Sequence, residues 1–161
     1  AAVAPITISE VPAASTNESA AVFPAVAAAP ALPVPLETER LILRDWKEDD
    51  IEQFIRHTNT TEVMRWLGGV KPPEEIRDIV RSRLMRWQEE RGFTFWVVER
   101  KEDEAFLGFC GLKIADGQGS TVSGEYEIGW RFREDSWGRG YAKEAAMASL
   151  DHAFDMPDAP E

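Results

Sequence analysis

Residues Trp137 to Ala142 have the residue types and spacing best suited to bind a ligand in this chain. Gly138 and Gly140 let the backbone come close to a bound group, and the sequence that follows them is typical of a helix. The first turn of a helix leaves N–H groups unpaired and carries the positive end of the helix dipole. The pattern therefore predicts an anion-binding loop, for which a phosphorylated cofactor is the natural occupant.

The segment just before this loop predicts a strand that carries carboxylates on one face. Because side chains alternate along a strand, one face is polar and the other apolar. The polar face holds Glu125, Glu127, Gly129 and Arg131, and the apolar face holds Tyr126, Ile128, Trp130 and Phe132. A bulge in the strand would reverse this assignment.

Composition limits the classes of function. The 161-residue chain has the size of one domain, and its net charge of −11 argues against a nucleic-acid partner, which needs clustered Lys and Arg.

Cys110 is the only cysteine, so no intrachain disulfide forms, and its apolar surroundings predict a buried core residue. His57 and His152 have no ligand partner at helical spacing, so we expect no metal site and no metal cofactor. A lone cysteine fits a reducing compartment, and we expect a cytoplasmic protein.

Residues 1–35 predict a disordered extension. They hold twelve Ala and six Pro, and the prolines cut the apolar run into pieces too short for a membrane span. We therefore expect no membrane partner, and we place the folded domain at residues 36–161. A linker to an upstream domain is the alternative for residues 1–35, and the sequence does not separate the two.

The helices and strands that must position the loop are predicted from the spacing of apolar residues and from the residues that start or end helices. Asp45 is predicted to cap the first helix, Pro72 and Pro73 to open a longer one, and Gly92 to end it. From Phe93 the period changes from helical to alternating, which predicts strands. The expected order is a strand at 41–44, helices at 47–57, 61–67 and 72–91, strands at 93–100, 105–114 and about 121–132, and a helix at 140–154. This order indicates an α+β fold, a mainly antiparallel sheet flanked by helices.

The element order, the opening Thr38-Glu39-Arg40-Leu41-Ile42-Leu43-Arg44 and the run Trp137-Gly138-Arg139-Gly140-Tyr141-Ala142 after Glu127-Ile128-Gly129 resemble the GNAT acetyltransferase superfamily. The resemblance is to its ribosomal-protein N-acetyltransferase (RimJ/RimL-like) branch and spans about residues 37–155. That branch often carries Trp where the wider superfamily has Gln or Arg, so Trp137 is interpreted as a branch marker. An ordinary strand-to-helix turn is the competing interpretation of the loop alone.

The resemblance implies acetyl-CoA as co-substrate and a primary amine as acceptor. It implies that the backbone of Trp137, Gly138, Arg139, Gly140, Tyr141 and Ala142 binds the pyrophosphate. It also implies that the strand Ile128, Gly129, Trp130, Arg131 and Phe132 pairs with the pantetheine arm. The acceptor is either the α-amine of a protein N-terminus or a small-molecule amine. The sequence does not choose between them.

An amine must be neutral to attack a thioester, so a base or a water chain has to remove its proton. In the resembling family a carboxylate on this strand often serves as that base. The candidate is Glu127, with Glu125 second. The alternative, that both carboxylates are solvated or orient the substrate, stays open.

The resemblance also implies further strands and a helix carrying a tyrosine acid, and no residue here corresponds to them. We therefore expect an incomplete GNAT domain at 36–161, either truncated from a longer product or completed by a partner chain. An exposed sheet edge would then favour pairing with a second copy. The alternative function is a non-catalytic fragment or an acyl-CoA-binding module.

Overall fold

The computed structural model describes residues 34–115 and 124–156, and an antiparallel sheet forms their centre. Its strands are β1 (Leu36–Glu37), β2 (Leu41–Arg44), β3 (Phe95–Arg100), β4 (Phe106–Ile114) and β5 (Tyr126–Phe132). They lie in the order β1-β2-β3-β4-β5. The predicted extension at 1–35, up to residue 33, and the predicted strand start at 121–123 lie outside the described residues.

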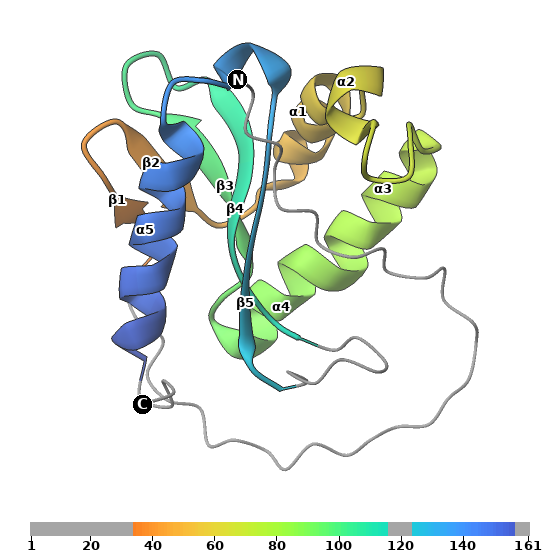
Figure 1. The fold of residues 1–161 in the computed structure, drawn as a ribbon. Helices are drawn as coiled ribbons and strands as arrows, with labels where there is room; N and C mark the ends of the chain where they lie inside the picture. Colours follow the sequence, from red (N-terminus) through yellow and green to blue (C-terminus); the bar gives the residue numbers. More distant parts are fainter. Residues whose placement is uncertain (1–33, 116–123, 157–161) are drawn as a thin grey trace, which may run out of the picture.

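Helices cover both faces of this sheet, so the predicted α+β class is confirmed. They are α1 (Glu48–Thr58), α2 (Thr61–Met64), α3 (Pro73–Ile79), a π-helical stretch (Val80–Met85), α4 (Arg86–Arg91), a 3₁₀ turn (Glu134–Ser136) and α5 (Tyr141–Phe154). In Figure 1, α5 lies on one side of the sheet and the series from α1 to α4 on the other. The predicted start at Pro73 and the stop at Gly92, which has a left-handed φ of 74°, are confirmed.

The predicted cap at Asp45 is wrong. The N-cap residue of α1 is Lys47, whose backbone N–H donates to the Asp50 carboxylate at 2.7 Å. Arg44 holds that carboxylate with two hydrogen bonds of 2.8 and 2.9 Å. Arg44 lies in the preceding strand, and its two bonds hold the Asp50 carboxylate where it accepts from the backbone N–H of Lys47. Asp50, and not Asp45, therefore caps the start of the helix.

Two hydrophobic cores lie on the two faces of the sheet, and alternation along the strands divides the residues between them. Trp96 packs with Leu112 and Ala145 under α5, whereas Val97 packs with Phe54 and other residues of the α1–α4 side. Trp96 and Val97 are both fully buried. The small residue Ala145 lets α5 lie close to the sheet.

Strand β5 is the outer strand of the described sheet and pairs with β4 in a continuous register from Gly108↔Phe132 to Ile114↔Tyr126. Ala115 donates its N–H to Glu125, and the Arg133 N–H donates to Leu107. Backbone groups alternate in direction along a strand, so the odd-numbered residues of β5 bond to β4. The N–H and C=O groups of Tyr126, Ile128, Trp130 and Phe132 therefore point to the open edge.

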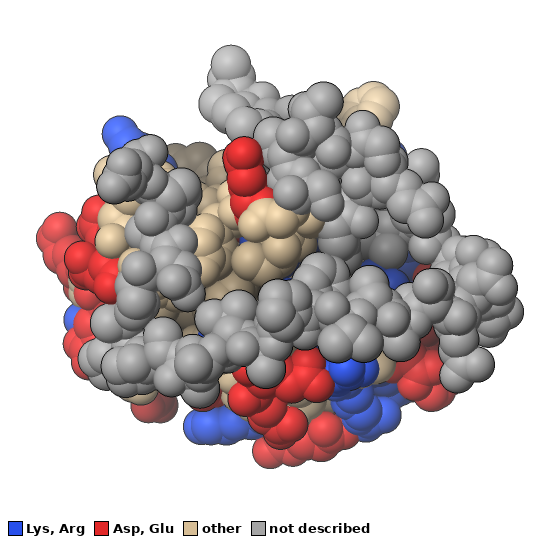
Figure 2. All heavy atoms as spheres, turned by 90° about the horizontal axis from the view of Figure 1, so that it is seen from below, with Lys and Arg blue, Asp and Glu red and all other residues tan. Residues whose placement is uncertain are grey.

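Acidic and basic side chains are mixed on the described surface, and Figure 2 shows them next to one another on the face seen from below. Ion pairs account for part of this mixing, such as Arg77 with Glu52 and Arg133 with Asp135, each at 2.6 Å. Acids outnumber bases by 29 to 18 in the sequence.

Candidate functional site

The loop between β5 and α5 has the open backbone that its glycines predicted. After the 3₁₀ turn at Glu134–Ser136 the chain passes through Gly138 and Gly140, with left-handed φ angles of 75° and 79°. A Cβ atom added at Gly138 would have no heavy atom within 4 Å. The space beside this backbone is therefore open to a ligand.

The N–H groups of this loop and of the first turn of α5 lack acceptors within the described residues. Within the described residues, the backbone N–H groups of Gly138, Arg139, Gly140, Tyr141, Ala142 and Lys143 have no hydrogen-bond partner, and the first bond of the helix runs from Glu144 to Gly140 at 3.1 Å. An ordinary helix start leaves four such groups, and here the preceding loop adds more. Together with the helix dipole they can bind an anion.

Arg40, from the turn between β1 and β2, fixes the conformation of this loop. Its guanidinium donates to the Arg139 carbonyl at 2.9 Å and to the Glu144 carboxylate at 2.8 Å. Its backbone N–H bonds to the same carboxylate at 3.0 Å, and the guanidinium lies 4.5 Å from the centre of the Tyr141 ring. The loop carbonyl is thereby turned toward Arg40, which leaves the N–H groups for a ligand.

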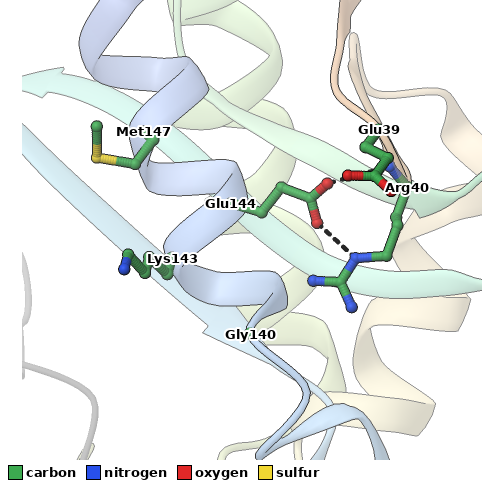
Figure 3. Close-up of a pocket in the computed structure, with 6 residues that line it drawn as sticks. All are labelled: Glu39, Arg40, Gly140, Lys143, Glu144 and Met147. Carbon is green, nitrogen blue, oxygen red and sulfur yellow. Dashed lines mark hydrogen bonds and ion pairs between the residues drawn. The ribbon is translucent and has the colours of Figure 1, made fainter.

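A shallow pocket lies where Arg40 meets the first turns of α5. Its lining comes from Glu39, Arg40, Gly140, Lys143, Glu144 and Met147. Figure 3 shows Glu144 pointing toward Arg40, whereas Lys143 and Met147 point to the other side of the helix. Arg40 was not among the predicted site residues, although it belongs to the opening run Thr38–Arg44 that carried the family resemblance.

Trp137 ends the open edge of β5. Its indole N–H donates to the Phe132 carbonyl at 2.9 Å, and the residue is 40% exposed. The bond occupies the outward-pointing carbonyl of Phe132, and further along the same edge the outward N–H and C=O groups of Ile128 and Trp130 remain for a ligand. The predicted strand residues Gly129 and Arg131 direct their backbone toward β4 and do not contribute to the edge.

The two predicted carboxylates differ in their surroundings. Glu127 stands opposite Lys113 on β4, with 3.4 Å between a carboxylate oxygen and Lys113 Nζ. The Lys113 side chain is 8% exposed and the Glu127 side chain 32%, so this pair is partly shielded from water. Glu125 precedes the strand and is exposed. The structure therefore sets Glu127 beside the open edge in a defined contact and leaves Glu125 in solvent.

The cysteine and the second histidine of the chain are buried in the core and do not belong to the candidate site. Cys110 is fully buried, its Sγ lies 3.6 Å from the Ser149 hydroxyl, and burial raises the pKa of its thiol to about 12. His152 is buried edge-on against Trp96, with 5.1 Å between the ring centres. Within residues 34–115 and 124–156 there is no cluster of His, Cys, Asp and Glu suited to a metal ion. Nor does a helix in that part have the length and apolarity to cross a membrane.

Comparison with known proteins gives consistent results. Residues 40–161 match the acetyltransferase (GNAT) domain family. The chain is 35% identical over 120 residues to the uncharacterized protein YkkB of Bacillus subtilis, covering 74% of this chain and 67% of that protein. It is 27% identical over 122 residues to the uncharacterized N-acetyltransferase p20 of Bacillus licheniformis, covering 74% and 65%.

Solved structures agree on the fold. A GNAT acetyltransferase from Bacillus anthracis superposes with a TM-score of 0.59 at 27% identity, covering 75% of this chain and 66% of that one. An acetyltransferase from Agrobacterium tumefaciens gives a TM-score of 0.64 at 26% identity, covering 77% and 68%. The chain thus spans about two thirds of the length of the relatives it matches.

Proposed function

Because the chain belongs to the GNAT acetyltransferase family, we propose that it transfers the acetyl group of acetyl-CoA to a primary amine. The observation that carries this proposal is the run of unpaired N–H groups from Gly138 to Lys143 at the start of α5. Such a run suits the pyrophosphate of a coenzyme A molecule, which offers oxygens of both phosphates to several donors at once.

The remaining residues of the site fit the rest of the cofactor. The outward N–H and C=O groups of Ile128 and Trp130 offer an edge to which the amide groups of a pantetheine arm can bond, as an added strand would. Arg139 adds a positive charge beside these N–H groups, and the open space at Gly138 admits a phosphate. Acetyl-CoA, when bound, supplies an activated thioester, and no metal takes part in the proposal.

Glu127 is proposed as the base that removes the proton from the acceptor amine. Its carboxylate lies 3.4 Å from Lys113 Nζ, and this contact holds it beside the outer edge of the sheet. A base of this kind contributes typically 10²–10⁴-fold to a rate. Glu125 is the second candidate, and its exposure makes it the matched comparison.

The acceptor class belongs to the proposal as well. The ribosomal-protein N-acetyltransferase branch, to which the Trp137 loop is similar, points to a protein N-terminus, and a small-molecule amine is the other acceptor. We place the reaction in the cytoplasm, with which the buried free thiol of Cys110 is compatible. The open edge of β5 is also a surface through which two copies can pair when the cofactor is absent.

The test uses the 161-residue chain and two measurements. Calorimetric titration with coenzyme A reports binding, and release of free thiol from acetyl-CoA with a panel of amines and N-terminal peptides reports transfer. We expect Glu127→Gln to lower kcat by about 10²–10⁴-fold with unchanged coenzyme A affinity, and Glu125→Gln to change kcat by less than about threefold. Binding without thiol release would favour the acyl-CoA-binding module. A chain that neither binds coenzyme A nor releases thiol would refute the proposal.

A further inference from the structure

Arg131 places a cation on an aromatic surface. Its side chain leaves β5 on the α1 side, and the guanidinium carbon lies 5.6 Å from the ring centre of Phe54 and 5.4 Å from that of Phe109. These two rings belong to the core between the sheet and α1–α4. The aromatic faces attract the cation but offer no hydrogen-bond acceptor in the plane of the guanidinium.

This guanidinium has no anionic partner in the described part of the chain. The buried Nε–H of Arg131 has no hydrogen-bond acceptor, and no ion pair involves the residue. Burial lowers the pKa of the side chain to about 10, which still leaves it protonated at neutral pH. A buried donor and a charge without partners are costly, so their retention calls for an explanation.

Carboxylates of β5 and of the turn that follows it do not supply the missing anion. Glu127, which shares the face of Arg131, is in contact with Lys113, and Asp135 is held by Arg133 through bonds of 2.6 and 2.8 Å. Both of these carboxylates are therefore already engaged. Other arginines of the described residues, such as Arg56 and Arg139, also lack an ion pair, but they are exposed, whereas the Nε of Arg131 is buried.

The anion that Arg131 would bind is distinct from the cofactor phosphates of the proposed site. The unpaired N–H groups of Gly138–Lys143 lie at the start of α5, and α5 lies on the opposite side of the sheet from α1 (Figure 1). Arg131 projects toward α1, on the face that also carries Glu127. An acceptor whose amine reaches Glu127 would thus pass Arg131 with another part of its structure.

We infer that Arg131 recognises a carboxylate on the amine acceptor, so that the substrate is an amino acid or a peptide with an acidic group rather than a simple amine. This inference rests on the proposed acetyl transfer. The planar fork of the guanidinium suits a carboxylate, which can accept from two N–H groups at once. Arg131 lies four positions after Glu127, or about 13 Å along the backbone, so the amine and the carboxylate must lie several bonds apart.

The kinetic test compares 6-aminohexanoate with hexylamine, which differ in the carboxylate alone. We expect the wild-type chain to favour the amino acid by roughly tenfold or more in kcat/KM, and Arg131→Gln to bring this ratio close to one. The KM for acetyl-CoA should not change. Arg133→Gln is the matched control, because it removes a neighbouring arginine that already has a partner, and it should keep the wild-type ratio. Equal rates for both amines in the wild type, or a preference that survives Arg131→Gln, would overturn the inference.

A second measurement does not depend on turnover. With ¹⁵N-labelled arginine, the Nε–H signal of Arg131 is identified by its loss in Arg131→Gln and followed during titration with 6-aminohexanoate and with hexylamine. A shift with the carboxylate alone supports the inference even if no amine is acetylated, in which case only the proposed function fails. No shift with either compound overturns it.

A purely structural role for Arg131 predicts a different result for Arg131→Met. This change keeps a long apolar side chain over Phe54 and Phe109 but removes the charge. If the guanidinium serves binding, the melting temperature should stay the same or rise while the carboxylate preference is lost. A clear fall in melting temperature, with the preference retained, would assign Arg131 to the core instead.

Discussion

Replacing Gly138 by alanine separates the cost of an unusual backbone from the loss of a binding site. Gly138 has a φ of 75°, and an added Cβ would meet no protein atom within 4 Å. The only cost in the free protein is therefore the left-handed conformation itself, roughly 1–2 kcal/mol for a residue with a Cβ atom. For a chain of this size we expect the melting temperature to fall by about 2–8 °C.

The effect on coenzyme A binding should be larger. The new methyl group occupies the space that a phosphate needs, so at least one hydrogen bond to a charged oxygen is lost, about 1.5–3 kcal/mol. This corresponds to roughly a ten- to hundredfold rise in Kd, because 1.4 kcal/mol equals a factor of ten. Calorimetric titration with coenzyme A measures it directly.

Gly69 provides the matched control. Its φ is 80° and a Cβ there also has nothing within 4 Å, but it lies in the loop between α2 and α3. We expect Gly69→Ala to lose the same stability as Gly138→Ala and to keep the wild-type Kd. If both variants bind coenzyme A equally well, the Gly138–Lys143 backbone is not the phosphate site and the reasoning fails.

Three further results are expected. Arg40→Ala should cost about 1 kcal/mol in chemical denaturation and weaken coenzyme A binding several-fold, since the loop loses its side-chain support; unchanged affinity would show that the loop holds its shape alone. Burial raises the pKa of Glu144, but its bonds from Arg40 outweigh this and leave the pKa below 4.5. Unfolding experiments should therefore show stability lost as pH falls from about 4.5, less steeply in Glu144→Gln, and parallel curves would contradict this. Cys110 should not react with a thiol reagent in the native chain and should react fully in denaturant, because its pKa is about 12; rapid native labelling would argue against the buried position.

Patterns local to the chain predicted the architecture well. Trp96 and Val97 illustrate why, because neighbouring residues of a strand face opposite sides and these two lie in different cores. The same alternation placed Glu127 and Arg131 on one face of β5, and the continuous register shows that no bulge reverses it. The positions of Gly138 and Gly140 followed from the need for left-handed backbone before a helix.

Contacts between distant segments could not be predicted in this way. Asp45 and Asp50 are equally suitable caps by type, and the choice of Asp50 depends on Arg44, which approaches from a strand. The bond from Trp137 to the Phe132 carbonyl depends on the path of the turn between them. That the Arg131 Nε has no partner within the described residues depends on the packing of segments distant in the sequence.

The bonds of Arg40 set the order in which the site can form during folding. They join residues 99 and 104 positions apart, whereas the hairpins of the sheet close over much shorter stretches. Closing a long loop is slower and costs more chain entropy than closing a short one. The hairpin β3–β4 can therefore form early, but the loop at Gly138 reaches its final shape only after α5 has docked beside the first strands. On a ribosome, the proposed coenzyme A loop is then completed only once Glu144 has left the exit tunnel, so nascent chains shorter than that should fold their sheet without binding coenzyme A.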